Sequence, residues 1–263
     1  MKISVVIPMY NSEKTIIRTL DSVKNQTVLP AEIIVVNDGS TDNSLNIVEN
    51  YVSLNTFLRI MIVDKSNGGV STARNAGIKA SKGNWIALLD SDDEWLANKL
   101  ERQIEILAQN PQIDFLGTNR NGEYFVNILW KKLDLLTKIS PKLLLVKFIF
   151  VVPTVVFKKS ITDAIGFFDE SQRYAEEGNY FIRIAQKYNC YLLNESLVLT
   201  GGGKEHFGHS GLSGNMKEME KGELKNIGDS LALEIINIFE YILLVVFSIL
   251  KYFRRVIVVK FFR

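Results

Sequence analysis

Four short apolar runs, each followed by polar or glycine-rich residues, constrain the fold of this chain more than any other feature. The runs contain many β-branched side chains and cover residues 3–7, 33–36, 58–63 and 85–89. Between them lie stretches with the apolar spacing of helices, at residues 13–24, 44–54 and 70–80. Near-continuous apolar strands that alternate with helices predict an α/β fold, with a mostly parallel central sheet and helices on both faces.

Polar side chains follow all four predicted strands. The residues at these strand ends read PMYNSE, NDGSTD, DKSNGG and DSDDE. In a parallel sheet the carboxyl ends of the strands share one edge, and ligands bind in the crevice beyond it. The sequence therefore predicts one polar ligand site at this edge.

The stretch WIALLDSDDEW, residues 85–95, carries an apolar strand directly into four carboxylates. Carboxylates this close repel one another, which raises their pKa values and destabilises the fold unless a cation or hydrogen-bond donors compensate. A bound divalent metal ion is one explanation. The other is a solvated turn in which one Asp caps a helix that begins near Glu94. This stretch alone does not decide between them.

Composition narrows the classes of function. At 263 residues and 47% hydrophobic, the chain is long enough to bury a large core. Its formal net charge of +2 is too small to indicate nucleic acid as a partner. Cys190 is the only cysteine, which excludes an internal disulfide and predicts a reducing compartment such as the cytoplasm. Pro8 and Asn11 end the first apolar run too early for a signal peptide.

Four motifs occur in the order and spacing of a known family. They read SVVIPMYN, EIIVVNDGSTDNS, NGGVSTARNAGI and WIALLDSDDEW. With them the chain resembles the family 2 glycosyltransferases from Lys2 to about Leu199. The resemblance implies a GT-A, Rossmann-like fold and the transfer of a sugar from a nucleotide donor with inversion. Some members build bacterial lipopolysaccharide and O-antigen, and the overall look of this chain is similar to those.

The resemblance, together with a shift in composition beyond Asp229, predicts a division of the chain. Residues 1–228 are expected to form the glycosyltransferase domain. Within it, residues 1–95 would be the nucleotide-sugar-binding half and residues 96–228 the acceptor-binding half. A hydrophobic and basic tail follows at residues 229–263.

The resemblance assigns donor-binding roles at the strand ends. It places Pro8 and Tyr10 against the nucleotide, and Asp38 as the acceptor of a hydrogen bond from N3–H of uracil. Local packing and capping are the alternatives for the first two, and a turn beside Gly39 is the alternative for Asp38. The predicted nucleotide-sugar site comprises Pro8, Tyr10, Glu13, Asp38, Gly68, Arg74, Asp90, Ser91 and Asp92.

A nucleotide diphosphate needs a metal or cationic clamp, because its leaving oxygens gain negative charge as the sugar departs. Asp92 is the first choice as a ligand of Mn²⁺ or Mg²⁺, and the resemblance puts Asp90 near the metal and the ribose. For Asp93 a helix cap is favoured over a supporting role beside the metal. Arg74 fits a pairing with phosphate or with the Asp cluster better than a surface salt bridge.

The two histidines, His206 and His209, lie in the glycine-rich stretch of residues 201–215. This stretch holds six glycines and shows no apolar periodicity, which is typical of a loop. His209 is a candidate metal ligand if the loop closes over the donor. A solvated histidine is the favoured alternative.

Inverting transfer also needs a base that removes the proton of the acceptor hydroxyl. RYAEEGNYFIRIAQ, residues 173–186, matches the frame in which family members carry a Glu-Asp pair at a helix start. Glu176 and Glu177 occupy the place of that pair, and Glu177, in place of the usual Asp, is the predicted base. Gly178 and Tyr180 also depart from the family pattern. An exposed acidic helix start without a chemical role is the alternative.

The tail combines apolar and basic residues. Residues 231–250 are strongly apolar, but polar residues interrupt them, and the unbroken part is too short to span a bilayer. Cations and aromatic residues are interleaved in residues 251–263, which suits an amphipathic helix on an anionic cytoplasmic membrane surface. A core helix that packs on the catalytic domain, or on the second subunit of a homodimer, is the alternative.

Together these features predict an inverting hexosyltransferase with a UDP-sugar donor, glucose or galactose being favoured. The predicted acceptor is a lipid-linked or lipopolysaccharide glycan, reached by a peripheral protein at the cytoplasmic face of the bacterial inner membrane. A metal-dependent nucleotidyltransferase is one rival, but PMYNSE lacks the basic, glycine-rich loop expected after its first strand. The other rival is a catalytically silent membrane-docking protein, which would keep acidic strand ends at an electrostatic cost without use.

Overall fold

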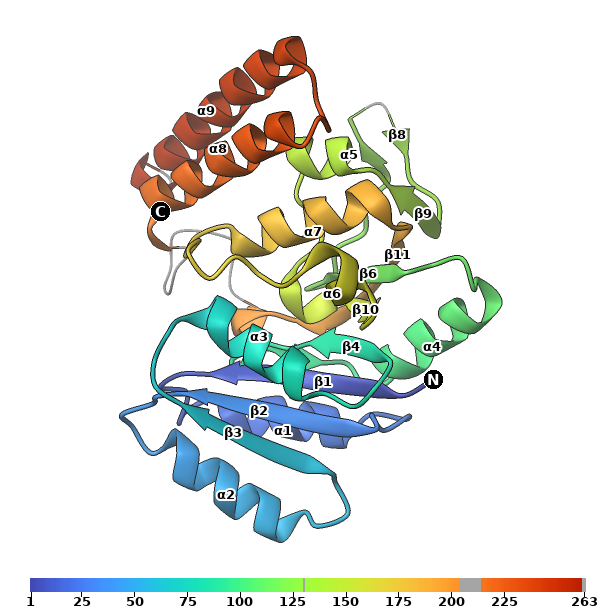
Figure 1. The fold of residues 1–263 in the computed structure, drawn as a ribbon, viewed down its shortest axis with the longest axis vertical. Coiled ribbons are helices and arrows are strands. Elements are labelled where there is room, and N and C mark those ends of the chain that lie inside the picture. The colour runs from blue at the N-terminus through green and yellow to red at the C-terminus, as the bar shows by residue number, and fades with distance from the viewer. Residues whose placement is uncertain (130, 204–213, 262–263) are drawn as a thin grey trace.

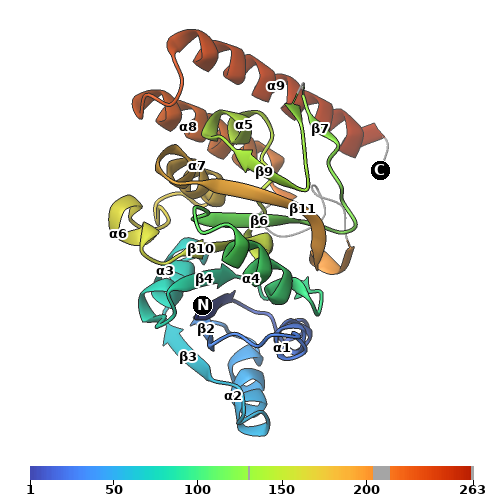
Figure 2. The same ribbon diagram turned by 90° about the vertical axis from the view of Figure 1, so that its right-hand side faces the viewer.

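The computed structural model describes residues 1–129, 131–203 and 214–261. In this part of the chain, helices lie on both sides of a central sheet, and two long helices lie side by side at one end of the molecule (Figure 1, Figure 2). The strands are β1 (Ile3–Met9), β2 (Glu32–Asp38), β3 (Ile60–Lys65), β4 (Trp85–Leu88), β5 (Glu94–Trp95), β6 (Phe115–Arg120), β7 (Asn127–Ile128), β8 (Lys131–Lys132), β9 (Leu136–Ile139), β10 (Val156–Lys158) and β11 (Cys190–Leu199). The helices are α1 (Ile16–Lys24), α2 (Ser44–Leu54), α3 (Val70–Ala80), α4 (Lys99–Gln109), α5 (Pro141–Val146), α6 (Ile161–Ile165), α7 (Glu176–Lys187), α8 (Met216–Ala232) and α9 (Ile238–Phe261), with 3₁₀ turns at Val152–Thr154 and Gly201–Gly203.

The described residues form a nine-stranded sheet with the order β3-β2-β1-β4-β10-β6-β11-β5, and β9 pairs with β11. β1 pairs in parallel with β2 and β4, and β2 pairs in parallel with β3. β10 is antiparallel to both of its neighbours, whereas β6 and β11 are parallel to each other. The predicted α/β fold is confirmed, and its longest run of parallel strands is β3-β2-β1-β4 in the amino-terminal half.

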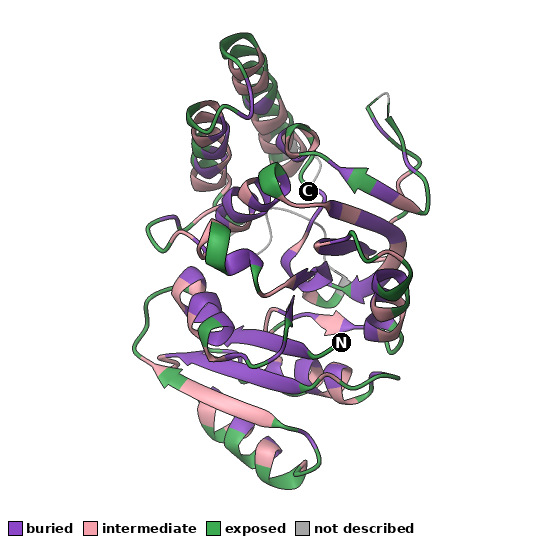
Figure 3. Ribbon diagram, turned by 45° about the vertical axis from the view of Figure 1, so that its right-hand side comes forward, coloured by how far each residue is buried: buried purple, intermediate pink, exposed green. Residues whose placement is uncertain are grey.

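Two hydrophobic cores fill the two faces of the sheet. In β1, Val5 and Ile7 belong to one core and Val6 to the other, because successive side chains of a strand point to opposite faces. Residues of α1, α2 and α4 complete the first core, and residues of α3 and α7 contribute to the second. Every residue of β1 and β2 is buried, as Figure 3 shows by colour. A strand covered on both faces needs such a continuous apolar run.

The bounds of the early helices agree with the sequence patterns, with one clear exception. The predicted helices at residues 44–54 and 70–80 are confirmed as α2 and α3. The helix expected to begin near Glu94 is wrong, because residues 94–95 form β5 against β11 and α4 begins only at Lys99. Asp93 therefore caps no helix, and the favoured interpretation of that residue is wrong.

The predicted carboxyl-terminal helix is α9, which lies against α8 (Figure 1). Arg255 joins the two helices, since its guanidinium lies 2.7 Å from the carboxylates of both Glu220 and Glu223. α8 itself runs across residue 228, so the predicted domain border falls inside a helix. Within the described ranges, no helix combines the length and the apolar character that a membrane crossing requires.

α9 has one covered side and one uncovered side. Tyr241, Leu244 and Val245 pack against the hydrophobic core. The exposed large apolar side chains of the helix are Ile238, Phe239, Ile242, Leu243, Val246, Phe247, Ile249, Leu250, Phe253 and Ile257. α9 thus packs on the rest of the chain and still presents an apolar side to the surroundings.

Candidate active site

A cleft of about 1440 Å³ opens at the carboxyl ends of the parallel strands. It is lined by residues from all four predicted strand ends, by residues before and at the start of α7, and by Met219 of α8. Pockets for one small ligand usually measure roughly 300–1,000 Å³, so this cleft has room for a second substrate. Its lining includes the predicted site residues Pro8, Tyr10, Glu13, Asp38, Gly68, Arg74, Asp90, Ser91, Asp92, Glu176 and Glu177. His206 and His209 lie outside the described residues.

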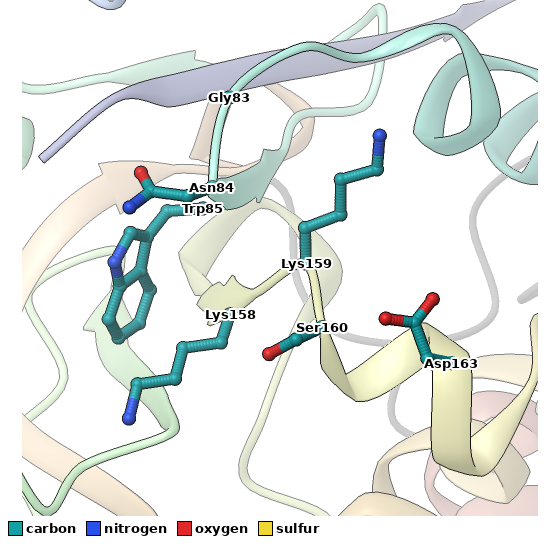
Figure 4. A pocket seen from close by; sticks show the side chains of 7 residues that line it. All are labelled: Gly83, Asn84, Trp85, Lys158, Lys159, Ser160 and Asp163. Carbon is teal, nitrogen blue, oxygen red and sulfur yellow. The ribbon is translucent and has the colours of Figure 1, made fainter.

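A smaller pocket of about 340 Å³ lies at the opposite, amino end of β4 (Figure 4). Figure 4 shows the side chains of Lys158 and Lys159 leaving the backbone in opposite directions. Lys158 Nζ lies 2.7 Å from Asp114 Oδ1, and Lys159 Nζ donates to the carbonyl of Ser81. Because both cations of this pocket are engaged within the protein, the large cleft is the stronger candidate.

Asp38 lies buried at the end of β2, at the wall of the cleft. Its Oδ1 accepts hydrogen bonds from Lys65 Nζ at 2.5 Å and from the Gly68 N–H at 3.0 Å. Its Oδ2 accepts a hydrogen bond from the Gly69 N–H at 2.8 Å. Gly69 has a φ of 91°, which favours glycine at this position. These bonds fix the carboxylate, whose role toward a nucleobase stays a prediction.

The loop after β1 forms the edge of the cleft beside the acidic turn. Pro8 is buried within β1, and Tyr10 is 50% exposed. The Glu13 carboxylate accepts a hydrogen bond at 3.2 Å from the N–H of Asn43, just before α2. Ser91 Oγ lies 2.7 Å from an oxygen of the same loop, Ser12 Oγ. Glu13 therefore shows a capping contact, whereas Tyr10 leaves its ring open to a ligand.

The acidic turn after β4 is anchored through its backbone and through Asp93. Arg18 Nη2 donates to the carbonyl of Asp92 at 2.9 Å. The Asp93 carboxylate is buried and accepts a hydrogen bond from the Gly201 N–H at 2.7 Å. Burial, and then the charges of Asp90 and Asp92, raise the pKa of Asp93 to about 8, while the Gly201 N–H opposes this shift. Asp93 therefore anchors the turn internally, and Asp92 is exposed at the cleft.

Asp90 and Asp92 are the carboxylates that could hold a divalent ion. Over the described residues, no group of three or more His, Cys, Asp or Glu side chains is arranged to hold a metal ion. Mg²⁺ is usually bound by one or two carboxylates together with substrate phosphates, and Mn²⁺ favours the same oxygen ligands. Two Asp side chains on one turn at the cleft fit this mode of binding. The predicted third ligand, His209, lies outside the described residues.

Arg74 of α3 connects the acidic turn with α7. Its Nη2 lies 2.9 Å from Asp90 Oδ1, its Nη1 lies 2.7 Å from Glu176 Oε1, and only 4% of its side chain is exposed. Burial opposes the charge of Arg74, but Asp90 and Glu176 outweigh burial and raise its pKa. The structure thus pairs Arg74 with the Asp cluster, one of the two predicted options. The alternative of a surface salt bridge is wrong.

Glu176 and Glu177 form the first turn of α7 and differ in their surroundings. Glu176 is buried and paired with Arg74. Glu177 lines the cleft, and burial of its carboxyl, followed by the charge of Glu176, raises its pKa to about 8 against the opposing effect of Arg74. Neither glutamate is exposed, so the alternative of a solvated acidic helix start is wrong.

The residue before this pair has a strained backbone that α8 supports. Ala175 has a φ of 53° and a ψ of 30°, a left-handed conformation that costs a residue with a side chain roughly 1–2 kcal/mol. Its carbonyl accepts hydrogen bonds from the side chains of Gln172 at 3.2 Å and Asn226 at 2.9 Å. A Cβ on Gly222 would lie 2.3 Å from the carbonyl oxygen of Tyr174. Close packing by α8 therefore positions the turn that carries both glutamates.

Sequence reasoning missed three contributors to this site. Lys65 contacts Asp38, Gln172 supports the turn before α7, and Met219 lines the cleft from α8. A signal existed for Lys65, which lies in the polar strand end DKSNGG. No comparable signal existed for Gln172 and Met219, because their contacts depend on how distant helices pack.

The sequence model described as "Glycosyl transferase family 2" matches residues 4–168. The chain belongs to glycosyltransferase family 2. This membership confirms the resemblance drawn from the four motifs, and it argues against the nucleotidyltransferase rival.

Curated relatives in this family match parts of the chain. The "Uncharacterized glycosyltransferase EpsJ" of Bacillus subtilis is 42% identical over 115 residues, which are 44% of this chain and 33% of that protein. An uncharacterized glycosyltransferase of Rickettsia typhi is 32% identical over 210 residues, which are 74% of this chain and 62% of that protein. The chain thus spans less than two thirds of the length of these family members.

Solved structures share the fold along most of the chain. TarS of S. aureus, residues 1–349, has a TM-score of 0.70 and 20% identity, and the match covers 97% of this chain and 72% of that one. The mannosyltransferase PcManGT from Pyrobaculum calidifontis, in complex with GDP-Man and Mn²⁺, has a TM-score of 0.69 and 18% identity, with coverage of 88% and 64%. At such identities the likeness shows the fold alone, and it confirms the GT-A architecture predicted for this family 2 member.

Proposed function

We propose that the protein is an inverting glycosyltransferase that transfers a hexose, with glucose or galactose favoured, from a UDP-sugar to a glycan acceptor. One observation carries this proposal. A single cleft contains both an acidic turn suited to a metal-bound diphosphate and Glu177, a carboxyl group with a raised pKa. Family membership supports the same reaction class.

The donor occupies the side of the cleft formed by the strand ends. Asp38 accepts a hydrogen bond from the uracil, and Pro8 and Tyr10 contact the nucleotide at the edge of the cleft. Asp92 and Asp90 would hold Mn²⁺ or Mg²⁺, and the bound ion would offset the negative charge that develops on the leaving diphosphate. Two structures with this fold support such a donor and metal, since TarS has been solved with UDP-GlcNAc and PcManGT with GDP-Man and Mn²⁺.

The acceptor occupies the side of the cleft formed by α7 and the turn before it. Glu177 takes the proton of the acceptor hydroxyl while that oxygen forms a bond to the anomeric carbon. The bond from this carbon to the diphosphate breaks, and its electron pair leaves with UDP. A raised pKa suits this task, because a stronger base accepts a proton more readily at neutral pH. Glu176 is held by Arg74 and positions the start of α7.

The uncovered side of α9 supports a lipid-linked or lipopolysaccharide glycan as the acceptor. This side is apolar, and Arg254 is exposed on the same helix. Apolar and cationic side chains on one helix suit the surface of an anionic membrane. Peripheral binding at the cytoplasmic face of the bacterial inner membrane brings the cleft to an acceptor that is anchored in lipid.

The direct test is transfer of labelled sugar to a bacterial lipid extract in the presence of Mn²⁺. We expect UDP-glucose or UDP-galactose to label a lipid-linked product, and NMR of that product to show an inverted anomeric configuration. Asp92→Ala should abolish transfer and the Mn²⁺-dependent thermal stabilisation by UDP. Asp163→Ala, which removes an exposed carboxylate outside the cleft, is the control. Transfer from GDP-mannose alone, or retained configuration, would contradict the proposal.

A further inference from the structure

The hydrogen bonds around Asp38 limit which nucleobase can donate hydrogen bonds to its carboxylate. We propose that Lys65 is a specificity-determining residue that makes this site accept uracil and reject guanine. This inference rests on the proposed function, since it concerns the base of the same nucleotide-sugar donor. It assigns a role to a side chain that contacts Asp38, a residue of the cleft lining.

The carboxylate of Asp38 has a limited number of acceptor positions. An ionised carboxylate offers about four lone-pair positions, two on each oxygen. Oδ1 uses both of its positions, for Lys65 Nζ and the Gly68 N–H. Oδ2 uses one, for the Gly69 N–H. One acceptor position therefore remains for a ligand in the cleft, and it lies on Oδ2.

Lys65 is held in place by several hydrogen bonds. An ammonium group has three donor hydrogens, and Nζ contacts three acceptors: Asp38 Oδ1 at 2.5 Å, the Ser66 carbonyl at 2.7 Å and Thr72 Oγ1 at 3.0 Å. The backbone is shaped around this group, because a Cβ on Gly68 would lie 2.7 Å from Thr72 Oγ1 and 3.1 Å from Lys65 Nζ. Lys65 is thus held against Asp38, and a ligand does not easily displace it.

Uracil and guanine differ in the number of donors that they present to a carboxylate. Uracil presents a single N–H, at N3, between two carbonyl oxygens, so one remaining acceptor position satisfies it. Guanine presents N1–H and the N2 amino group side by side, and a carboxylate binds both only if it has two positions to offer. Next to Lys65, one guanine donor would stay buried without a partner. An unsatisfied buried donor weakens binding by roughly 10- to 100-fold.

The test is calorimetric titration of UDP and of GDP into the protein at one Mn²⁺ concentration, so that the diphosphate and metal contributions cancel in the ratio of the two affinities. The wild type should bind UDP roughly 10- to 100-fold more tightly than GDP. Lys65→Met frees an acceptor position on Oδ1 and should reduce this preference to roughly threefold or less. Lys65→Arg keeps a cationic donor and should keep the preference. Lys187→Met makes the same change at an exposed lysine of α7 and serves as the control.

The outcomes separate this inference from the proposed function. Equal affinity of the wild type for UDP and GDP, or an unchanged preference in folded Lys65→Met, would overturn the role of Lys65 while the donor site stands. Failure of the wild type to bind either nucleotide would instead overturn the proposed function. If circular dichroism shows that Lys65→Met does not fold, Lys65→Leu decides, because its side chain has no hydrogen-bond donor and also releases Oδ1.

Discussion

At the scale of single residues, two neighbouring glutamates have different chemical surroundings. Arg74 Nη1 lies 2.7 Å from Glu176 Oε1 and holds that carboxylate in a buried ion pair. Burial, and then the charge of Glu176, raise the pKa of Glu177, which lines the cleft. The glutamate that Arg74 hydrogen-bonds therefore orders the helix start, and the other is suited to accept a proton.

Replacing the proposed base tests this division. Glu177→Gln keeps the length of the side chain but cannot take up the acceptor proton, so turnover should fall by roughly 10²- to 10⁴-fold while UDP affinity stays near that of the wild type. Glu177→Asp should keep more activity than Glu177→Gln. Glu176→Gln should mainly destabilise the protein, by about 1–3 kcal/mol in urea unfolding, because it weakens a buried ion pair. Full activity of Glu177→Gln would remove the assignment.

The same pKa sets a pH dependence of both activity and stability. Because the base must be ionised, kcat/KM should rise with pH and level off above a pH of about 8. The free energy of unfolding changes with pH in the opposite direction. The pKa of Glu177 is higher in the folded chain than its ordinary value of 4.5, so folding favours the protonated carboxyl. The stability that this group contributes is therefore fully present below pH 4.5 and is lost as the pH rises toward 8. Glu177→Gln should therefore gain stability relative to the wild type between about pH 5 and pH 8. Urea unfolding across this range measures it, and a constant difference would contradict it.

The sequence indicated which residues would meet, but only some of the pairs that they form. Side chains that follow buried parallel strands share one edge of the sheet, so Asp38 and Asp90 could be placed in one site. The pairing of Arg74 with Glu176 joins two distant parts of the chain, and no local pattern indicates such a contact. Lys65 was missed for a related reason, since its partner lies on the neighbouring strand.

At the scale of elements, α8 holds the turn before α7 by close packing at one glycine. In Gly222→Ala the new Cβ would meet the Tyr174 carbonyl oxygen at 2.3 Å, so α8 must shift. We expect a loss of about 1–3 kcal/mol of stability and a lower kcat, measured by urea unfolding and sugar transfer. Gly228→Ala is the control on the same helix, where the Cβ meets nothing within 4 Å and stability should rise by roughly 0.5–1 kcal/mol. Equal stabilisation by both substitutions would contradict the role of α8.

Elements defined by local patterns were predictable, and elements defined by distant partners were not. Apolar spacing alone gave the bounds of α2 and α3. β5 is two residues long and exists because β11 pairs with it, so no local pattern around Glu94 indicated this strand. A helix start near Glu94 was one of two interpretations of the acidic stretch, and α4 begins only at Lys99. The same limit applies to α9, whose apolar pattern indicated an amphipathic helix but not the contact of Arg255 with α8.

At the scale of the whole molecule, the cleft and the uncovered side of α9 belong to one connected structure. α8 contributes Met219 to the cleft and Glu220 to the interface with α9. Tyr241 and Leu244 of α9 pack against the core. Deleting the tail would therefore uncover core residues as well as remove the apolar side, and substitutions confined to exposed positions give the cleaner test of membrane binding.

Substitution of three apolar residues on the uncovered side of α9 by aspartate provides that test. Leu243→Asp, Leu250→Asp and Phe253→Asp together should weaken co-sedimentation with vesicles that contain phosphatidylglycerol by roughly 100-fold or more, because burial of apolar side chains drives such binding. The unfolding temperature should change little, since all three side chains are exposed. Leu54→Asp with Phe57→Asp changes two exposed apolar residues, at the end of α2 and in the turn after it, and serves as the control that should leave binding unchanged. Unchanged vesicle binding by the triple variant would contradict membrane docking. If the wild type does not bind vesicles, and the triple variant changes from dimer to monomer in size-exclusion chromatography, this side of α9 lies at a subunit interface.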